Sequence, residues 1–360
     1  MTEIDFVPSA YTADREEGSV TWQAPSNIAL IKYWGKRGNQ IPANPSLSFT
    51  LNKCLTTTTV SYKKLSSRSD NFSFDLLFDD LPKEDFKPKI KSFFVKIEEY
   101  MPFLKDYHFL INTSNTFPHS SGIASSASGM AALALCLMDI ERVLNLSADE
   151  DFFKRKASFL ARLGSGSACR SIDGEIITWG IHKAIATSSD LYAVKYSDEV
   201  HKVFKNYRDT ILLVHKGQKQ VSSTLGHNLM HNHPFAAQRF NQAHENLVKL
   251  KSVLASGDLE GFVAIVEQEA LTLHAMMMTS SPYFVLMMPN TLKIINAIWD
   301  FRKASKTHLC FTLDAGANVH LLYPKNEAAE VLQFIKDELV VYCENGQYIC
   351  DEIGIGAKKL

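Results

Sequence analysis

Charged and hydroxyl side chains lie beside small residues in several short segments of this chain, and that combination suits the binding of an anion. The first segment has Lys32, Tyr33, Trp34 and Lys36 within five residues, close to Asn27. A lysine ammonium is a compact point charge that can neutralise an anionic substrate, and a tyrosine hydroxyl adds a directed donor. Lysines beside aromatic residues could equally be solvated charges at the end of a strand, and the cluster alone leaves both interpretations open.

A stretch of small residues, PHSSGIASSASG at 118–129, leads into an apolar, helix-forming segment at 130–144. Small residues let backbone N–H groups approach a ligand, and the start of a helix adds unpaired donors and partial positive charge. The stretch can therefore bind a phosphate, although it is neither a Walker A motif nor G-x-G-x-x-G. Small residues also allow a helix to pack closely, so phosphate binding needs support from the rest of the chain.

Two more turns carry donors for anions. The turn GSGSACRS at 164–171 has serines, backbone donors and Arg170, which could hold a carboxylate or phosphate through two parallel hydrogen bonds. A glycine helix cap followed by an exposed arginine is the alternative, and both can hold together. The turn VSSTLG at 221–226 follows Lys216 and Lys219, and it could either bind a second phosphate or simply cap a helix.

A single acidic residue, Asp314, ends an apolar segment in FTLDAGAN. A rigid strand could deliver this carboxylate to a pocket, although aspartate is also common in plain turns. Bound phosphates would raise the pKa of the carboxyl unless a cation offset them, and Lys32 is the candidate cation. Of His227, His231 and His233, two lie four residues apart, but no Cys, Asp or Glu nearby completes a metal-binding set.

Composition narrows the class of protein. A chain of 360 residues favours two domains, and its 46% hydrophobic content is that of a globular protein. With 38 basic and 39 acidic residues there is no basic field for nucleic acid, and no apolar run predicts a membrane span. The polar, acidic N-terminal residues predict neither a signal nor a transit peptide. The six scattered cysteines indicate reduced thiols in a cytoplasmic protein.

Strands and helices are mixed in both halves, which predicts an α/β or α+β fold. In the first half we expect strands at 20–24, 46–51, 55–62, 107–112 and 174–180, with helices at 85–100, 130–144 and 149–163. The strands at 46–51 and 55–62 are expected to pair. In the second half we expect strands at 210–214, 307–313 and 318–322, with helices at 234–255, 259–278, 291–305 and 327–339. Charge and polarity rise over 197–209, which predicts domains at 1–205 and 206–360.

Five segments, in this order, resemble the mevalonate diphosphate decarboxylase family of the GHMP kinase superfamily: APSNIALIKYWGKRG, FPHSSGIASSASG, GSGSACRS, VSSTLG and LDAGAN. The resemblance extends from Thr21 to Tyr323. It implies a two-domain GHMP-kinase-like fold with the active site in the interdomain cleft. The implied reaction, part of the mevalonate pathway of isoprenoid biosynthesis, converts ATP and mevalonate 5-diphosphate to isopentenyl diphosphate, ADP, phosphate and carbon dioxide.

The resemblance also implies roles for single residues. Lys32 and Asp314 would face the tertiary hydroxyl of the substrate, and Arg170 and Asn27 would hold its carboxylate. The other implied substrate contacts are Tyr33, Trp34, Lys36, Ser165, Ser167, Ser222 and Ser223. The implied contacts to ATP are Ser120, Ser121, Gly122, Ala124, Ser125 and Ser126, and Ser126 is also the candidate contact for Mg²⁺.

The sequence leaves three alternative functions open. A relative could phosphorylate the same hydroxyl without decarboxylation, as a mevalonate 3-kinase, or act on the monophosphate, as a phosphomevalonate decarboxylase. A non-catalytic relative that only binds a ligand is a third option. Retention of Lys32, Arg170 and Asp314 together favours the full reaction. The family implies a homodimer whose ligands are small molecules.

Overall fold

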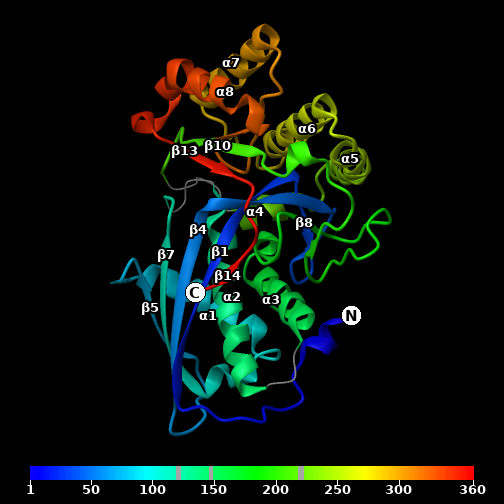
Figure 1. Ribbon diagram of the computed structural model, residues 1–360. Coiled ribbons are helices and arrows are strands. Elements are labelled where there is room, and N and C mark those ends of the chain that lie inside the picture. The colour runs from blue at the N-terminus through cyan, green and yellow to red at the C-terminus, as the bar shows by residue number, and fades with distance from the viewer. Residues whose placement is uncertain (119–122, 146–148, 218–222) are drawn as a thin grey trace.

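Two antiparallel strands run through the centre of the molecule and connect its two halves (Figure 1). The computed structural model describes residues 1–118, 123–145, 149–217 and 223–360, without the side chains of residues 223 and 224. Strand β1 (Glu17–Ile31) pairs with β4 (Ser46–Lys64) over almost its whole length. Hydroxyl side chains form hydrogen bonds between the two strands, and Oγ1 of Thr21 lies 2.9 Å from Oγ1 of Thr59. Rows of β-branched and hydroxyl residues suit such cross-strand contacts.

The first sheet has eight strands. Six follow the order β14-β1-β4-β7-β5-β6, while β8 pairs with the first residues of β4 and β9 pairs with β8. Its remaining strands are β5 (Ser73–Phe78), β6 (Leu81–Pro82), β7 (Tyr107–Asn115), β8 (Ile176–Trp179), β9 (Val194–Lys195) and β14 (Lys358–Lys359). A separate hairpin contains β2 (Lys36–Arg37) and β3 (Ile41–Pro42).

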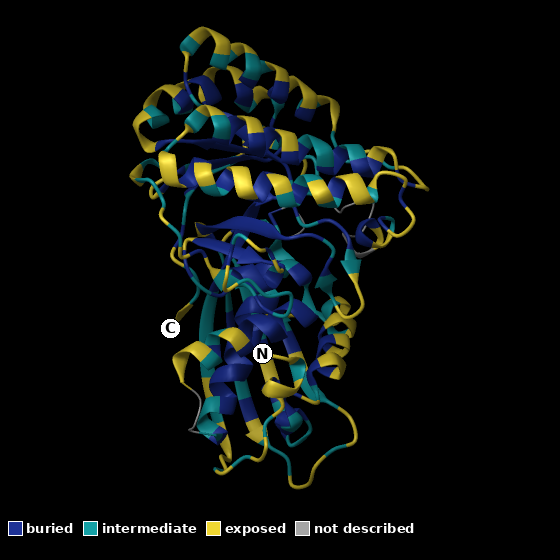
Figure 2. Ribbon diagram, turned by 90° about the vertical axis from the view of Figure 1, so that its right-hand side faces the viewer, coloured by how far each residue is buried: buried dark blue, intermediate teal, exposed yellow. Residues whose placement is uncertain are grey.

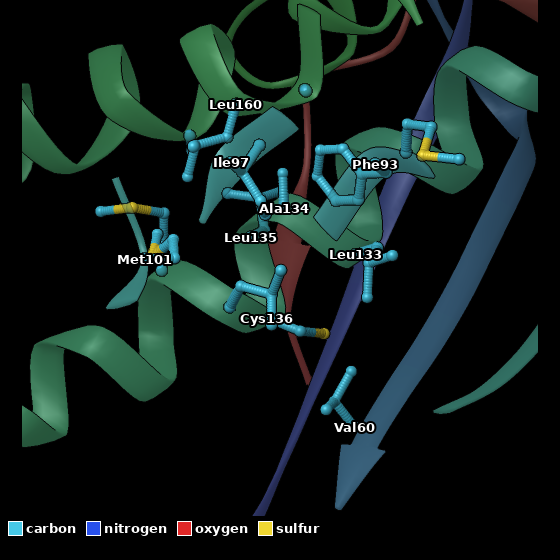
Figure 3. Packing of buried hydrophobic residues seen from close by; sticks show 14 of the residues in the cluster. Val60, Phe93, Ile97, Met101, Leu133, Ala134, Leu135, Cys136 and Leu160 are labelled. Atoms are coloured by element: carbon cyan, nitrogen blue, oxygen red, sulfur yellow. The ribbon is translucent and has the colours of Figure 1, made fainter. Parts of the chain in front are cut away.

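Three helices pack against this sheet: α1 (Lys87–Ile97), α2 (Ser125–Leu144) and α3 (Glu150–Gly164). Helix α2 is apolar on nearly every side, as expected of a helix that lies inside a core. Figure 3 shows Leu133 and Leu135 of α2 packed among Phe93 and Ile97 of α1 and Val60 of β4. The core therefore fixes α2, and with it the small-residue segment at its start.

The second sheet has the order β11-β12-β10-β13 and is antiparallel throughout. Its strands are β10 (Arg208–Leu212), β11 (Cys310–Thr312), β12 (Val319–Tyr323) and β13 (Tyr348–Glu352). The helices of this half are α4 (Ser223–Asn228), α5 (Ala236–Ser256), α6 (Leu259–Met278), α7 (Pro289–Ser305) and α8 (Ala328–Phe334). Figure 2 shows the long helices with buried and exposed faces, as amphipathic helices require.

The main helices agree with the prediction to within a few residues, but the pairing predicted for two strand segments is wrong. The segments 46–51 and 55–62 are one continuous strand, β4, and do not pair with each other. The strand expected at 20–24 is confirmed, but β1 is longer and extends from Glu17 to Ile31. Strands β5 and β13 were not predicted, because apolar and polar residues do not alternate strictly in SFDLLF or YICDE. None of the helices in the described ranges combines the length and apolar character needed to cross a bilayer.

The continuity of β4 depends on a carboxylate from the other half of the chain. The ladder between β1 and β4 shifts register between Pro25 and Asn27, where β4 bulges. The bulge frees three backbone N–H groups, and the buried Asp351 of β13 accepts from Asn52 at 2.9 Å, Lys53 at 2.8 Å and Cys54 at 2.8 Å. Asp351 thus replaces the strand partner that the bulge removes.

We predict that Asp351→Ala lowers the free energy of unfolding by about 2 to 4 kcal/mol, because the N–H groups of the bulge lose a charged acceptor. Asp351→Asn keeps one acceptor oxygen, so its loss should be smaller. Denaturant unfolding of both variants beside the wild type measures the difference. Equal stability of Asp351→Ala and the wild type would show that the carboxylate is not what holds the bulge.

Candidate active site

One cavity brings together most of the residues that sequence analysis singled out. Their positions along the chain differ by up to 282 residues, and water could occupy about 300 Å³ of the space between them. The predicted residues that line it are Lys32, Tyr33, Trp34, Lys36, Ala124, Ser126, Ser165, Ser167, Arg170 and Asp314. Because these residues come from both halves, the cavity is a cleft between them.

The other predicted residues lie nearby or outside the described ranges. Ser125 lines a neighbouring cavity, and Asn27 accepts a hydrogen bond from Arg170. Ser120, Ser121, Gly122 and Ser222 lie outside the described residues, as does the side chain of Ser223.

An ion pair between Lys32 and Asp314 lies at the centre of the cleft. The ammonium of Lys32 is 3.1 Å from Oδ1 of Asp314, and its side chain is only 2% exposed while that of Asp314 is 26% exposed. Lys32 is therefore not a solvated charge at a strand end. Burial lowers the pKa of Lys32, whereas Asp314 and then Glu269 act to raise it. An anion that enters the cleft meets a cation with little water around it, which strengthens the attraction.

The backbone of Lys32 is held on both sides by buried side chains. Its N–H donates to Oε2 of Glu269 at 2.9 Å, and its carbonyl accepts from Arg239 at 3.1 Å and from Asn44 at 3.0 Å. Arg239 and Glu269 form an ion pair that is completely buried, and Asn246 donates to Glu269 at 2.8 Å. Lys32 directly follows β1, and these side chains satisfy its backbone N–H and carbonyl as a neighbouring strand would. They therefore fix the position of Lys32 at the end of the strand.

His274 holds the other member of the central pair. Its Nε2 lies 3.2 Å from the carbonyl oxygen of Asp314, which can only accept, so the imidazole donates. Burial lowers the pKa of His274 to about 4, which keeps the ring neutral at ordinary pH. Asp314 follows β11, and the loop after that strand is thus tied to helix α6.

Arg170 lies in a short 3-10 helix, Gly166–Ser171, that follows α3. It is buried and donates to Ser46 Oγ and, at 3.3 Å, to Oδ1 of Asn27. Asn27 in turn donates to Ser171 Oγ at 2.8 Å. The alternative interpretation, in which Arg170 is an exposed residue after a helix cap, is therefore wrong. Arg170 is instead a buried cation, held in position, that lines the cleft. A guanidinium held in this way can bind a carboxylate with defined geometry.

The same 3-10 helix packs closely against Tyr33. A Cβ at Gly166 would lie 2.8 Å from the hydroxyl oxygen of Tyr33, so only glycine allows this approach. Ser165 and Ser167 flank Gly166 and line the cleft. The predicted anion turn and the predicted lysine and tyrosine cluster therefore form one wall.

The start of α2 faces two cavities at once. Ala124 has a left-handed backbone, with φ of 49°, and Ser126 Oγ lies 3.3 Å from Ser165 Oγ. The second cavity is largely apolar and shares Ser126 and Lys89 with the cleft. It is lined by Thr56, Thr58, Leu76, Phe78, Phe86, Lys89, Ile90, Ile111, Thr113, Asn115, Ser125, Ser126, Gly129, Met130 and Leu133. An apolar cavity that meets the N-terminus of a long helix fits a nucleotide, with the base inside and the phosphates at the helix end.

Sequence analysis did not single out Lys89, Arg239 or Glu269, and it considered His227 only as a possible metal ligand. Lys89 is one of several lysines on α1, and nothing in the sequence distinguishes it. Arg239 and Glu269 lie on the buried faces of α5 and α6. A charged residue at an apolar position of an amphipathic helix is a signal for such a pair, but it does not say which residues meet.

Two sequence models of known families match the chain. One describes the diphosphomevalonate decarboxylase-like N-terminal domain and matches residues 24–193, and the other describes the mevalonate 5-diphosphate decarboxylase C-terminal domain and matches residues 210–354. The chain belongs to the mevalonate diphosphate decarboxylase family. The family resemblance seen in five sequence segments is therefore confirmed.

Individual members of the family agree with this assignment. A diphosphomevalonate decarboxylase from Ganoderma lucidum is 29% identical over 352 residues, which cover 93% of this chain and 84% of that protein. The crystal structure of mevalonate diphosphate decarboxylase from Staphylococcus aureus has 27% identity and a TM-score of 0.80, and it covers 96% of this chain and 98% of that one. A structure of MDDEF in complex with MVAPP, AMPPCP and magnesium has the same identity and TM-score and covers 96% and 99%. The predicted GHMP-kinase-like α/β fold is confirmed.

The role of the buried Arg239–Glu269 pair in holding the backbone of Lys32 can be tested. We expect Glu269→Gln to lower kcat by about 10²-fold, because Arg239 loses its partner and the backbone of Lys32 shifts. KM for ATP should change much less, since neither residue of the pair lines the apolar cavity beside α2. Steady-state kinetics beside Glu260→Gln, an exposed glutamate on the same helix, provides the comparison. An unchanged kcat in Glu269→Gln would show that Lys32 does not depend on this support.

Proposed function

We propose that the cleft catalyses the ATP-dependent decarboxylation of mevalonate 5-diphosphate to isopentenyl diphosphate, with release of ADP, phosphate and carbon dioxide. The observation that carries the proposal is the convergence of Lys32, Arg170 and Asp314 in one cavity that adjoins an apolar cavity at the start of α2. The family supports it, and so does the relative solved with MVAPP, AMPPCP and magnesium.

Asp314 and Lys32 serve the first half of the reaction. A tertiary alcohol is a poor leaving group, so its oxygen first attacks the γ-phosphorus of ATP and ADP leaves. Asp314 orients the hydroxyl and takes its proton, while Lys32, 3.1 Å from that carboxylate, offsets the negative charge around it. Transfer of a phosphoryl group depends mainly on positioning and charge neutralisation, and buried cations supply both.

Arg170 and Asn27 serve the second half. The new phosphate leaves with the electron pair of its carbon–oxygen bond, which leaves positive charge on the tertiary carbon. The bond to the carboxylate then breaks, and its electrons form the double bond as carbon dioxide departs. Arg170, fixed by Ser46 and Asn27, holds the carboxylate in line for this step.

The remaining contacts divide between the diphosphate and the nucleotide. Tyr33, Trp34, Lys36, Ser165, Ser167, Ser222 and Ser223 are the proposed contacts to the substrate beyond its carboxylate and hydroxyl. Ser120, Ser121, Gly122, Ala124, Ser125 and Ser126 are the proposed contacts to ATP. Bound Mg²⁺ would neutralise charge on the phosphates, and the hydroxyl of Ser126 is its proposed protein contact.

Three broader features belong to the same proposal. We propose a cytoplasmic enzyme, in line with six cysteines that are all free thiols. We also propose a homodimer, as the family implies, and a division into domains at 1–205 and 206–360.

The decisive experiment measures the products that the purified protein forms from ATP, Mg²⁺ and mevalonate 5-diphosphate. We expect carbon dioxide and ADP in equal amounts. ADP without carbon dioxide would mean a mevalonate 3-kinase, and preference for the monophosphate would mean a phosphomevalonate decarboxylase. No ATP consumption with any of these substrates would leave a binding protein and contradict the proposal.

Asp314→Asn tests the assignment of the proton acceptor. We predict that kcat falls by about 10²-fold to 10⁴-fold, because the amide cannot take a proton and no longer pairs with Lys32. Asp300→Asn, at an exposed position on α7, is the matched control and should behave as the wild type. Nearly normal turnover of Asp314→Asn would remove this residue from the chemical step.

A further inference from the structure

His227 has no part in the proposal above, yet its ring lies in the wall of the cleft. It belongs to α4 and lines the same cavity as Lys32 and Asp314. Its imidazole is buried between two aromatic rings, with centroid distances of 4.2 Å to Tyr33 and 4.6 Å to Trp34. Sequence analysis proposed a substrate-binding cluster that contains the rings of Tyr33 and Trp34. The imidazole of His227 adds a third ring to it, from the other half of the chain.

The hydrogen bonding of His227 determines which nitrogen carries the proton. The backbone N–H of Gly35 donates to Nδ1 at 3.0 Å, so Nδ1 must be the unprotonated nitrogen. Burial lowers the pKa of His227 to about 3, and the charges of Lys36 and Arg170 act in the same direction. The ring is therefore neutral at ordinary pH, and its single proton is on Nε2.

That Nε2–H group has no acceptor in the part of the chain that the structure describes. Among the described residues no hydrogen bond reaches Nε2, and the atom is not sealed inside the protein, because His227 keeps surface in the cleft. The charged groups that act on the ring are both cations, Lys36 and Arg170. A buried donor in a positively charged cavity favours an anionic acceptor, since leaving such a group unpaired costs free energy.

We propose that His227 is a substrate-recognition residue whose Nε2–H donates a hydrogen bond to a phosphate oxygen of the substrate's diphosphate. The assignment rests on the proposed function and extends its diphosphate site. The neighbours of His227 agree with it, because Tyr33 and Lys36 are proposed contacts to the same group. Unlike the lysine, the neutral ring adds direction without charge, so it selects the position of the phosphate oxygen.

A purely structural role is the rival explanation, since the ring also fills the space between Tyr33 and Trp34. Two substitutions separate the roles. In His227→Asn, the amide oxygen lies near the place of Nδ1 and can still accept from Gly35, but nothing reaches the place of Nε2. In His227→Gln, the longer side chain can bring an amide N–H near the place of Nε2.

We expect His227→Asn to raise KM for mevalonate 5-diphosphate by about 10-fold to 100-fold, the range for loss of a hydrogen bond to a charged group. KM for ATP should stay within about twofold of the wild type, and kcat should fall by a smaller factor than KM rises. His227→Gln should recover part of the loss. His231→Asn, at an exposed position just after α4, is the matched control and should leave both KM values unchanged.

Two outcomes would overturn the assignment. An unchanged KM for the diphosphate substrate in His227→Asn would show that no hydrogen bond is lost. An equal loss in the Asn and Gln variants, accompanied by a lower melting temperature, would show that the ring only fills space. Carbon dioxide release by the wild type, measured in parallel, separates these results from failure of the proposed reaction.

A measurement on the unmodified protein does not depend on how the variants fold. With histidines labelled by ¹⁵N, we expect NMR to show a neutral His227 protonated at Nε2. Addition of inorganic pyrophosphate should shift the Nε2–H resonance, while the signal of His231 stays in place. A resonance that does not respond to saturating pyrophosphate would contradict the proposed contact.

Discussion

The ion pair between Lys32 and Asp314 is the interaction on which the rest of the site depends. A buried ammonium is stable only beside negative charge, and its removal from water is also what lets it act strongly on an incoming anion. The position of Lys32 is therefore fixed by several independent contacts. The Arg239–Glu269 pair holds its backbone, and His274 holds the carbonyl of its partner. Two layers of buried polar contacts thus surround a charge that would otherwise be too costly to bury.

The scaffold explains why these contacts can form. Strand β1 carries the chain from the first sheet into the cleft, and the bulge in β4 turns the neighbouring strand toward the second sheet. Helix α2, buried on nearly all sides, places its first turn between the cleft and the apolar cavity. Each wall of the cleft is thus attached to a rigid element, and the groups that would meet substrate need little rearrangement before they act.

Sequence alone could identify Lys32, Arg170 and Asp314, because each is a charged residue beside small residues or at the end of an apolar strand. Lys89, Arg239, Glu269 and His227 could not be identified in this way, since their roles come from contacts with residues far away in the chain. The long strand β4 shows the same limit. Its bulge is stable through Asp351, which lies about three hundred positions away, so no local pattern predicts the continuity.

The path of the last residues constrains how the halves can move. The chain passes from the first half to the second just before β10 and returns after β13 to pair β14 with β1. The two crossings are neighbours, because the N–H of Ile353 donates to the carbonyl of Tyr207 at 3.1 Å. These two hydrogen-bonded crossings are not the only link, because one buried apolar cluster joins residues of β1 and β4 to residues of β10, α5 and α6. The halves are therefore packed tightly together along this seam. Any widening of the cleft would then have to occur at the edge farthest from that seam.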